Sequence, residues 1–209
     1  MIGSVEEVAG VTDRRAERRA EKRATIIAAA WVLARRDGLG GLTLHGLAAA
    51  VGLRQPSLYV YFDSKLALYD ALFADGYRQL LHFMNGRDYS GKPRDALVRF
   101  LREQVEWAGA DFVRYQMLFQ RSIPGFEPSP ESWALAMEFY EIASALLSGA
   151  GLTEQSDIDL FSALVSGMSS QQAANDPGGE RWAKHADLAV DMFLAAARRR
   201  SAHRTGGRK

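Results

Sequence analysis

Apolar residues recur at helical spacing along most of this chain, and that pattern limits its fold more than any other feature. Within residues 26–34 the apolar positions lie three or four apart, as on one face of a helix, and Gly38 follows as a stop signal. The sequence has no run of alternating β-branched residues of the kind that forms strands. We therefore predict an all-α protein of about nine helices.

Composition excludes several classes of protein. The 209 residues include no cysteine, which excludes disulfides, thiolate zinc sites and cysteine nucleophiles. The four histidines have no metal-ligand spacing, and no serine lies in a nucleophile-elbow context, so we expect no metal, no cofactor and no enzyme activity. The longest apolar runs are far shorter than the roughly 18 residues of a membrane helix, and the N-terminus has no apolar signal segment. We expect a soluble cytoplasmic protein.

The segment 43–65, TLHGLAAAVGLRQPSLYVYFDSK, fits a helix-turn-helix, in which the second of two short helices enters the major groove of DNA. Thr43 precedes an apolar stretch as an N-cap, Ala48 is the small residue where the helices cross, and Gly52 suits the turn. An ordinary helical hairpin could share the spacing of Ala48 and Gly52. It would not need the hydroxyl and cationic side chains that cluster around the second helix, which suit contacts to phosphate.

Residues 23–72 resemble the DNA-binding domain of the TetR family of transcriptional regulators. The resemblance is carried above all by the string SLYVYFDSK at 57–65, together with VGL at 51–53 and the pair Leu47 and Ala48. It covers about a quarter of the chain closely, and the remainder matches in helical pattern and length. It implies an N-terminal three-helix helix-turn-helix domain, followed by a C-terminal helical domain for ligand binding and dimerisation.

The resemblance also implies which residues contact double-stranded DNA. Thr43, Tyr61 and Lys65 match positions that hold the phosphate backbone. The remaining contacts fall on the recognition helix, facing base edges or neighbouring phosphates: Arg54, Gln55, Ser57 and Tyr59. Family members usually have a small hydroxyl residue at the position of Arg54, and a guanidinium there could pair with both acceptors of guanine. We therefore expect Arg54 and Gln55 to read the operator sequence.

A basic run at residues 14–23 precedes this domain and has two interpretations. The run alternates cations with Glu17 and Glu21, as on a solvated helix face stabilised by pairs four residues apart. It could instead form an arm that follows the minor groove or the DNA backbone.

The second half of the chain is rich in large aromatic residues and methionines. Most of these would form a helical core. With scattered polar neighbours, namely Gln116, Gln120 and Gln171, they also suit an apolar ligand pocket between helices. The resemblance implies a small-molecule effector at such a pocket, and we expect it to be lined by Tyr115, Trp133, Met137 and Phe161.

Two late helices, expected over residues 158–172 and 182–197, carry apolar stripes. In the family, the last two long helices pair with their copies to form a homodimer. A two-fold dimer would also place two recognition helices on successive half-sites of a palindrome. The expected interface residues are Leu160, Leu164, Met168, Leu188, Met192 and Phe193.

Four segments follow from these assignments: a disordered N-terminus (1–12), a helix-turn-helix domain (13–72) whose fourth helix continues to about residue 85, an effector-binding and dimerisation domain (86–200), and a basic tail (201–209). The net charge of +1 hides an asymmetry between them. Residues 1–65 hold 10 Lys and Arg against 7 Asp and Glu, whereas residues 66–197 hold 10 against 18. A basic DNA-reading end therefore precedes an acidic helical body.

Together these features predict a homodimeric repressor that binds a palindromic operator and is released by a small lipophilic effector. Two alternatives stay open. The chain could be a protein-interaction adaptor with a non-functional helix-turn-helix, which salt-dependent and sequence-selective DNA binding would exclude. It could also be an all-α enzyme that uses the C-terminal cavity, which turnover of a co-purifying ligand would support.

Overall fold

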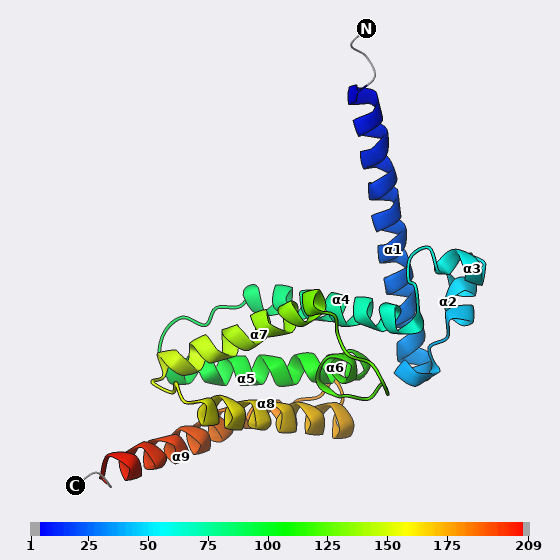
Figure 1. The fold of residues 1–209 in the computed structure, drawn as a ribbon. Helices are drawn as coiled ribbons and strands as arrows, with labels where there is room; N and C mark the ends of the chain where they lie inside the picture. Colours follow the sequence, from blue (N-terminus) through cyan, green and yellow to red (C-terminus); the bar gives the residue numbers. More distant parts are fainter. Residues whose placement is uncertain (1–4, 207–209) are drawn as a thin grey trace. The chain divides into compact units, whose positions relative to one another are not determined.

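The computed structural model describes the backbone of residues 5–206 and the side chains of residues 14–200. Over this range the chain forms nine α-helices and one 3-10 helix without any strand, which confirms the all-α prediction (Figure 1). No helix within this range is long and apolar enough to cross a membrane. The helices are α1 (Val5–Gly41), α2 (Leu44–Ala50), α3 (Gln55–Leu58), α4 (Lys65–Asn85), α5 (Pro93–Ala110), α6 (Phe112–Phe119), α7 (Pro130–Gly149), α8 (Gln155–Asn175), η1 (Ala183–His185) and α9 (Ala186–Gly206).

Both ends of the chain are more helical than the sequence predicts. We expect the segment 1–12 to be irregular, whereas the backbone from Val5 onward belongs to α1. The basic tail is likewise helical up to Gly206, at the end of α9. Both segments lack proline, and a helix that is already nucleated gains one hydrogen bond for each residue it adds. Residues 1–4 and 207–209 lie outside the described range.

The helices divide into two compact units. The first unit contains the chain up to Asp75 and the segment Arg121–Ser129, and the second contains Gly76–Gln120 and the chain from Pro130 onward. We expected the first domain to end at residue 72 and the second to begin at residue 86. The structure instead divides α4 between Asp75 and Gly76 and adds the segment Arg121–Ser129 to the first unit.

The first unit has a core formed by the C-terminal half of α1, the two short helices and the first half of α4. Ile26, Leu47, Leu58 and Leu68 have almost no exposed surface in this core. The apolar face that begins at Ile26 packs against α2 because a pair of helices this short has too few side chains to form a core alone.

The segment Arg121–Ser129 is fastened to the first half of α4. The Asp70 carboxylate accepts hydrogen bonds from the backbone N–H of Ser129 at 2.8 Å and from its hydroxyl at 3.0 Å. The ring of Phe126 makes edge contacts with the rings of Tyr69 and Phe73, at centroid distances of 6.2 and 6.1 Å. These contacts compensate for the lack of regular backbone pairing in a proline-rich loop.

The second unit is built around α5, which packs against α7, α8 and α9 (Figure 1). Ten of the eighteen residues of α5 are buried, and Phe100 lies at the centre of an aromatic cluster with Phe139 and Phe161. The turn between α8 and η1 is held by the buried Gln172, whose side-chain oxygen accepts the backbone N–H of Trp182 at 2.9 Å.

Candidate nucleic-acid interface and ligand cavity

The segment 43–65 folds as two short helices joined by a tight turn. Thr43 caps α2, since its hydroxyl oxygen accepts the N–H of Gly46 at 3.1 Å. Gly52 follows with φ of +67°, a conformation that favours glycine. The second helix, α3, ends at Leu58, whose side chain is buried.

The structure places most of the predicted DNA contacts on the surface of this pair of helices. Arg54, Gln55, Ser57 and Tyr59 are all exposed at or next to α3, and Thr43 is exposed at the start of α2. Arg54 occupies the N-cap position of α3 and makes no capping hydrogen bond with its side chain. Because Leu58 turns into the core, the polar residues around it are left facing outward.

Tyr61 and Lys65 lie deeper than the other predicted contacts, and both are half-buried. The ammonium group of Lys65 is 3.5 Å from the carbonyl oxygen of Gly40 and 5.4 Å from the centre of the Tyr69 ring. Lys65 therefore also ties the start of α4 to the end of α1.

Three cations of the basic run contact the helix-turn-helix, a role that neither sequence interpretation included. Arg19 donates to the carbonyl oxygen of Val60 at 2.8 Å, and Lys22 donates to that of Val51 at 3.3 Å. The guanidinium of Arg23 lies 5.0 Å above the centre of the Phe62 ring. These cations attach α1 to the turns that follow α2 and α3, where helical carbonyl groups lack intrahelical partners.

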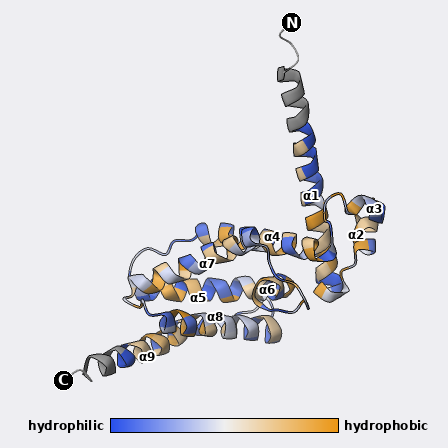
Figure 2. Ribbon diagram, in the orientation of Figure 1, coloured by the Kyte–Doolittle hydropathy of each residue, from blue (hydrophilic) through white to orange (hydrophobic). Residues whose placement is uncertain are grey.

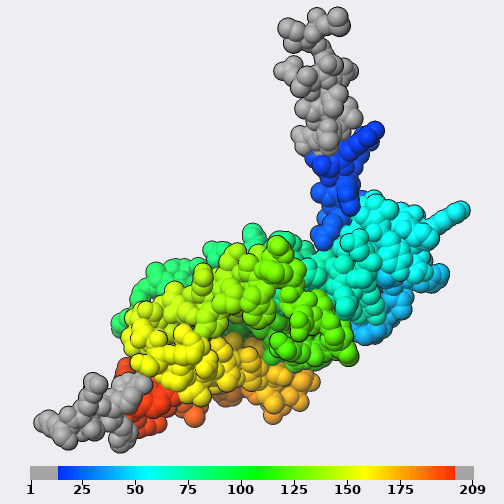
Figure 3. All heavy atoms as spheres, viewed as in Figure 1, coloured from blue at the N-terminus to red at the C-terminus, as the bar shows by residue number. Residues whose placement is uncertain are grey.

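The spacing of the cations along the basic run indicates these contacts. Arg19 and Lys22 continue, at intervals of three and four residues, the same helical face that is buried from Ile26 onward. The other side chains of the run, at positions 14–18, are exposed. Figure 2 shows α1 changing from hydrophilic to hydrophobic residues toward α2, and Figure 3 shows the blue part of α1 reaching the cyan surface of the short helices.

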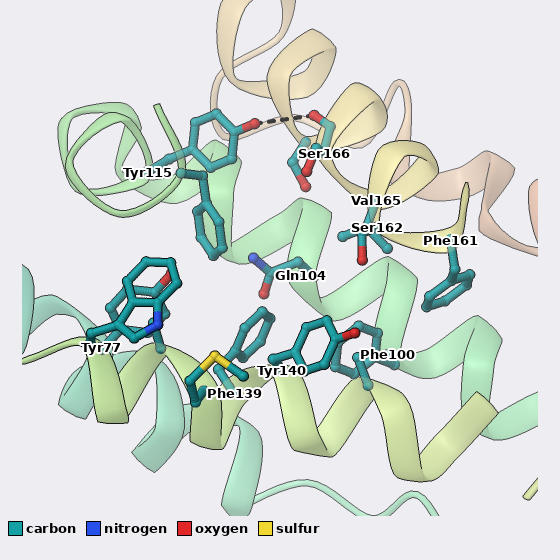
Figure 4. A pocket seen from close by; sticks show the side chains of 16 residues that line it. Tyr77, Phe100, Gln104, Tyr115, Phe139, Tyr140, Phe161, Ser162, Val165 and Ser166 are labelled. Carbon is teal, nitrogen blue, oxygen red and sulfur yellow. Dashed lines mark hydrogen bonds between the residues drawn. The ribbon is translucent and has the colours of Figure 1, made fainter. Parts of the chain in front are cut away.

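The second unit contains a cavity of about 230 Å³ between α4, α5, α6, α7 and α8. The structure brings together around it all four residues expected to line an effector pocket: Tyr115, Trp133, Met137 and Phe161. Tyr115 and Phe161 are labelled in Figure 4. The other lining residues are Tyr77, Phe100, Gln104, Phe119, Ala136, Phe139, Tyr140, Ala143, Ser162, Val165, Ser166 and Ser169.

The cavity wall is aromatic and carries no charged side chain. Burial raises the pKa of the Tyr77 and Tyr115 phenols above their usual value, because an apolar environment disfavours the phenolate. Both therefore stay neutral near pH 7. The Tyr115 hydroxyl donates to the carbonyl oxygen of Ser166 at 3.1 Å, and the Tyr77 hydroxyl donates to that of Leu118 at 3.4 Å.

The polar groups in the cavity differ from those that the sequence suggested. None of Gln116, Gln120 and Gln171 lines it. Gln104 does, with about 1% of its surface exposed, and its side-chain oxygen accepts no hydrogen bond from the protein. The equally buried Ser169 hydroxyl also lacks a protein partner. Gln104 follows Phe100 by one helical turn on the buried face of α5. A polar residue at such a core position in the sequence indicates a polar group inside the helical domain.

The residues expected at a dimer interface separate into two groups. Leu160, Leu188 and Met192 are exposed, with 47%, 60% and 65% of their surfaces accessible, and Leu164 and Met168 are half-buried. Phe193 is instead buried in its own chain, where its ring lies 5.3 Å from that of Phe161. Phe193 therefore lies on the inner face of α9 and leaves little surface for a second copy, because an apolar stripe in the sequence does not distinguish the inner face of a helix from the outer one.

One family of known proteins matches the region of the helix-turn-helix. Residues 26–72 match the family described as "Bacterial regulatory proteins, tetR family". Among curated proteins, no significant match to the chain was found.

The side chains at positions 14–200 include no group of three or more His, Asp or Glu that could hold a metal ion.

Solved structures of regulators share the fold along most of the chain. PfmR, a TetR family transcriptional regulator from Thermus thermophilus, is 23% identical, with a TM-score of 0.59 over 81% of this chain and 97% of its own. The transcriptional regulator FadR from Bacillus subtilis, in complex with stearoyl-CoA, is 14% identical, with a TM-score of 0.62 over 81% and 96%. AibR, in complex with isovaleryl coenzyme A and operator DNA, is 16% identical, with a TM-score of 0.61 over 84% and 97%. Residues 26–72 are therefore similar to the tetR family of bacterial regulatory proteins, and the fold of most of the chain is similar to that of solved transcriptional regulators.

Proposed function

We propose that this protein is a homodimeric transcriptional repressor that acts in the cytoplasm, binds a palindromic operator and leaves it when a small lipophilic effector binds. The observation that carries the proposal is the helix-turn-helix itself, in which Arg54, Gln55, Ser57 and Tyr59 are exposed around the buried Leu58. A helix pair built only for packing has no use for such a surface.

The chemistry of these side chains supports DNA binding. Arg54 can offer two parallel donors to the O6 and N7 acceptors of guanine, and the Gln55 amide can pair with adenine. The Thr43 oxygen accepts a hydrogen bond as the cap of α2, and its hydroxyl proton can still donate to a phosphate oxygen. Phosphate contacts of this kind set the register, whereas Arg54 and Gln55 read the bases.

Dimerisation is supported by the large apolar side chains exposed on the last two long helices. A second copy of the chain would bury the exposed side chains of Leu160 on α8 and of Leu188 and Met192 on α9. Two-fold symmetry gives two recognition helices, which is the arrangement that a palindromic operator requires.

The aromatic cavity supports release by a ligand. FadR and AibR, which share the fold, were solved with acyl-coenzyme A molecules. An effector that binds more tightly to the conformation with misaligned recognition helices would lower operator affinity by that difference in binding free energy.

Selection of bound DNA from a random pool tests the proposal most directly. We expect a palindromic consensus and an affinity that falls steeply with salt. Arg54→Ala should relax the preference at one position of each half-site and cost about 1–3 kcal/mol. Arg199→Ala, which removes an exposed arginine from α9, serves as the matched control and should keep the full consensus. Absent or salt-insensitive binding would overturn the proposal and favour the adaptor alternative.

A further inference from the structure

We propose that the cavity of the second unit takes an uncharged, flat molecule of about two fused rings that donates a hydrogen bond to Gln104. This inference rests on the proposed function, because it names the chemical class of the effector. It follows from the size of the cavity, the absence of charge in its wall and the buried acceptor that the wall contains.

The volume sets the size of the ligand. An engineered protein cavity of about 150 Å³ holds benzene, so a cavity of 230 Å³ holds about nine non-hydrogen atoms of similar packing. The wall presents the faces and edges of eight aromatic rings, which favours a planar, polarisable molecule over a branched one. The rim lies between α7 and α8, where Trp133 and Met137 are partly exposed opposite Ser162 and Ser166.

The wall also sets the charge of the ligand. None of its sixteen residues carries a charge, so an ionised group would lose its hydration without gaining a counter-ion. Coenzyme A thioesters, which the similar regulators FadR and AibR hold, carry several phosphate charges that this cavity cannot pair. A cation could interact with the aromatic faces, but no carboxylate lines the cavity to neutralise it.

Gln104 supplies the hydrogen-bonding preference. Its amide lies in the middle of the cavity, between Tyr115 on one side and Phe139 and Tyr140 on the other (Figure 4). The amide oxygen is a buried acceptor without a protein donor, which is a costly arrangement unless a ligand completes it. The buried hydroxyl of Ser169 offers a second polar contact within the same wall.

Calorimetric titration of the 209-residue chain without DNA tests this assignment. Indole and indene have the same ring skeleton, but only indole has an N–H donor, and we expect indole to bind about tenfold more tightly. Indole-2-carboxylate and 1-methylquinolinium provide an anionic and a cationic probe, and both should bind more weakly than indole. Equal affinity for indole and indene, tighter binding of either ion, or no binding of any probe would overturn the inference.

Gln104→Met removes the acceptor while keeping a side chain of similar length. We expect indole and indene to bind this variant with about equal affinity, because the acceptor that distinguishes them is gone. The melting temperature should not decrease, because the substitution removes a buried unpaired polar atom. A purely structural glutamine would behave differently: its loss would lower the melting temperature and weaken both ligands alike. Gln116→Met, at a half-buried position outside the cavity wall, should retain the preference and is the matched control.

Binding and regulation are separated by adding DNA. If indole binds through Gln104 but leaves operator affinity unchanged, the ligand class stands and release by an effector fails. If a charged ligand releases the operator in place of indole, the proposed function stands and the ligand class fails.

Discussion

Gln172→Leu should destabilise the second unit by about 2–4 kcal/mol. Gln172 is fully buried, and its side-chain oxygen accepts the N–H groups of Trp182 at 2.9 Å and Ala183 at 3.4 Å. Its side-chain nitrogen donates to the carbonyl oxygen of Gly179 at 3.0 Å. Leucine has a similar size but can form none of these bonds. The buried N–H of Ala183 would bear a full desolvation cost of about 1–3 kcal/mol, and the half-buried groups of Trp182 and Gly179 would each add a smaller one.

Urea unfolding followed by circular dichroism measures this loss. With a slope of about 1–3 kcal/mol/M, the midpoint should fall by roughly 1–3 M. Protein concentration must be held constant, because the proposed dimer would make the midpoint depend on it. Gln171→Leu is the control: this neighbouring side chain is exposed and contacts Asn175, so its loss should cost less than about 0.5 kcal/mol. Coincident midpoints for the two variants would refute the assignment of Gln172 as the residue that holds this turn.

Two further predictions concern arginines that bond to other parts of the chain. Arg19→Ala removes the hydrogen bond to the turn after α3 and should weaken operator binding more than Arg18→Ala, although each variant loses one charge. Equal losses in a fluorescence anisotropy titration would show that this bond does not position the recognition helix. Arg94 donates two hydrogen bonds to the Asp191 carboxylate, at 2.8 and 2.9 Å, and these hold the pKa of that carboxyl below its usual value. Any stability from the pair is therefore fully present above the usual pKa of an aspartate, and it is lost as the pH falls through the lowered pKa of Asp191. In Arg94→Ala, an NMR titration should show this pKa returning toward the usual range, and an unchanged midpoint would contradict the pairing.

The sequence was most informative where structure depends on neighbouring residues. The cap at Thr43 and the turn at Gly52 were predicted from local chemistry, and the structure has both. The start of α8 has no such local signal, since the helix begins at Gln155 and the side chain of its N-cap residue, Glu154, makes no capping hydrogen bond.

The composition of the cavity was only partly readable from the sequence. Aromatic residues in the second half indicate a pocket, and Tyr115, Trp133, Met137 and Phe161 lie in the wall of the cavity. The glutamine in the wall could not be chosen by composition, because several glutamines occur and only packing decides which of them faces inward. Gln104 lies inside the cavity wall, whereas Gln171 is exposed on α8. Packing likewise turned Phe193 toward the core and left Met192 outside.

Helical periodicity, caps and the string at 57–65 by themselves determined an all-α chain with a helix-turn-helix near its N-terminus. Each of these signals acts over a few residues, within reach of the backbone hydrogen bonds of a helix. The tertiary structure alone decided that the segment Arg121–Ser129 joins the first unit. That choice depends on Asp70 meeting Ser129, a partner 59 positions away, and on Phe126 packing against α4. Contacts between residues so distant in sequence leave no periodic pattern, so only the folded chain brings them together.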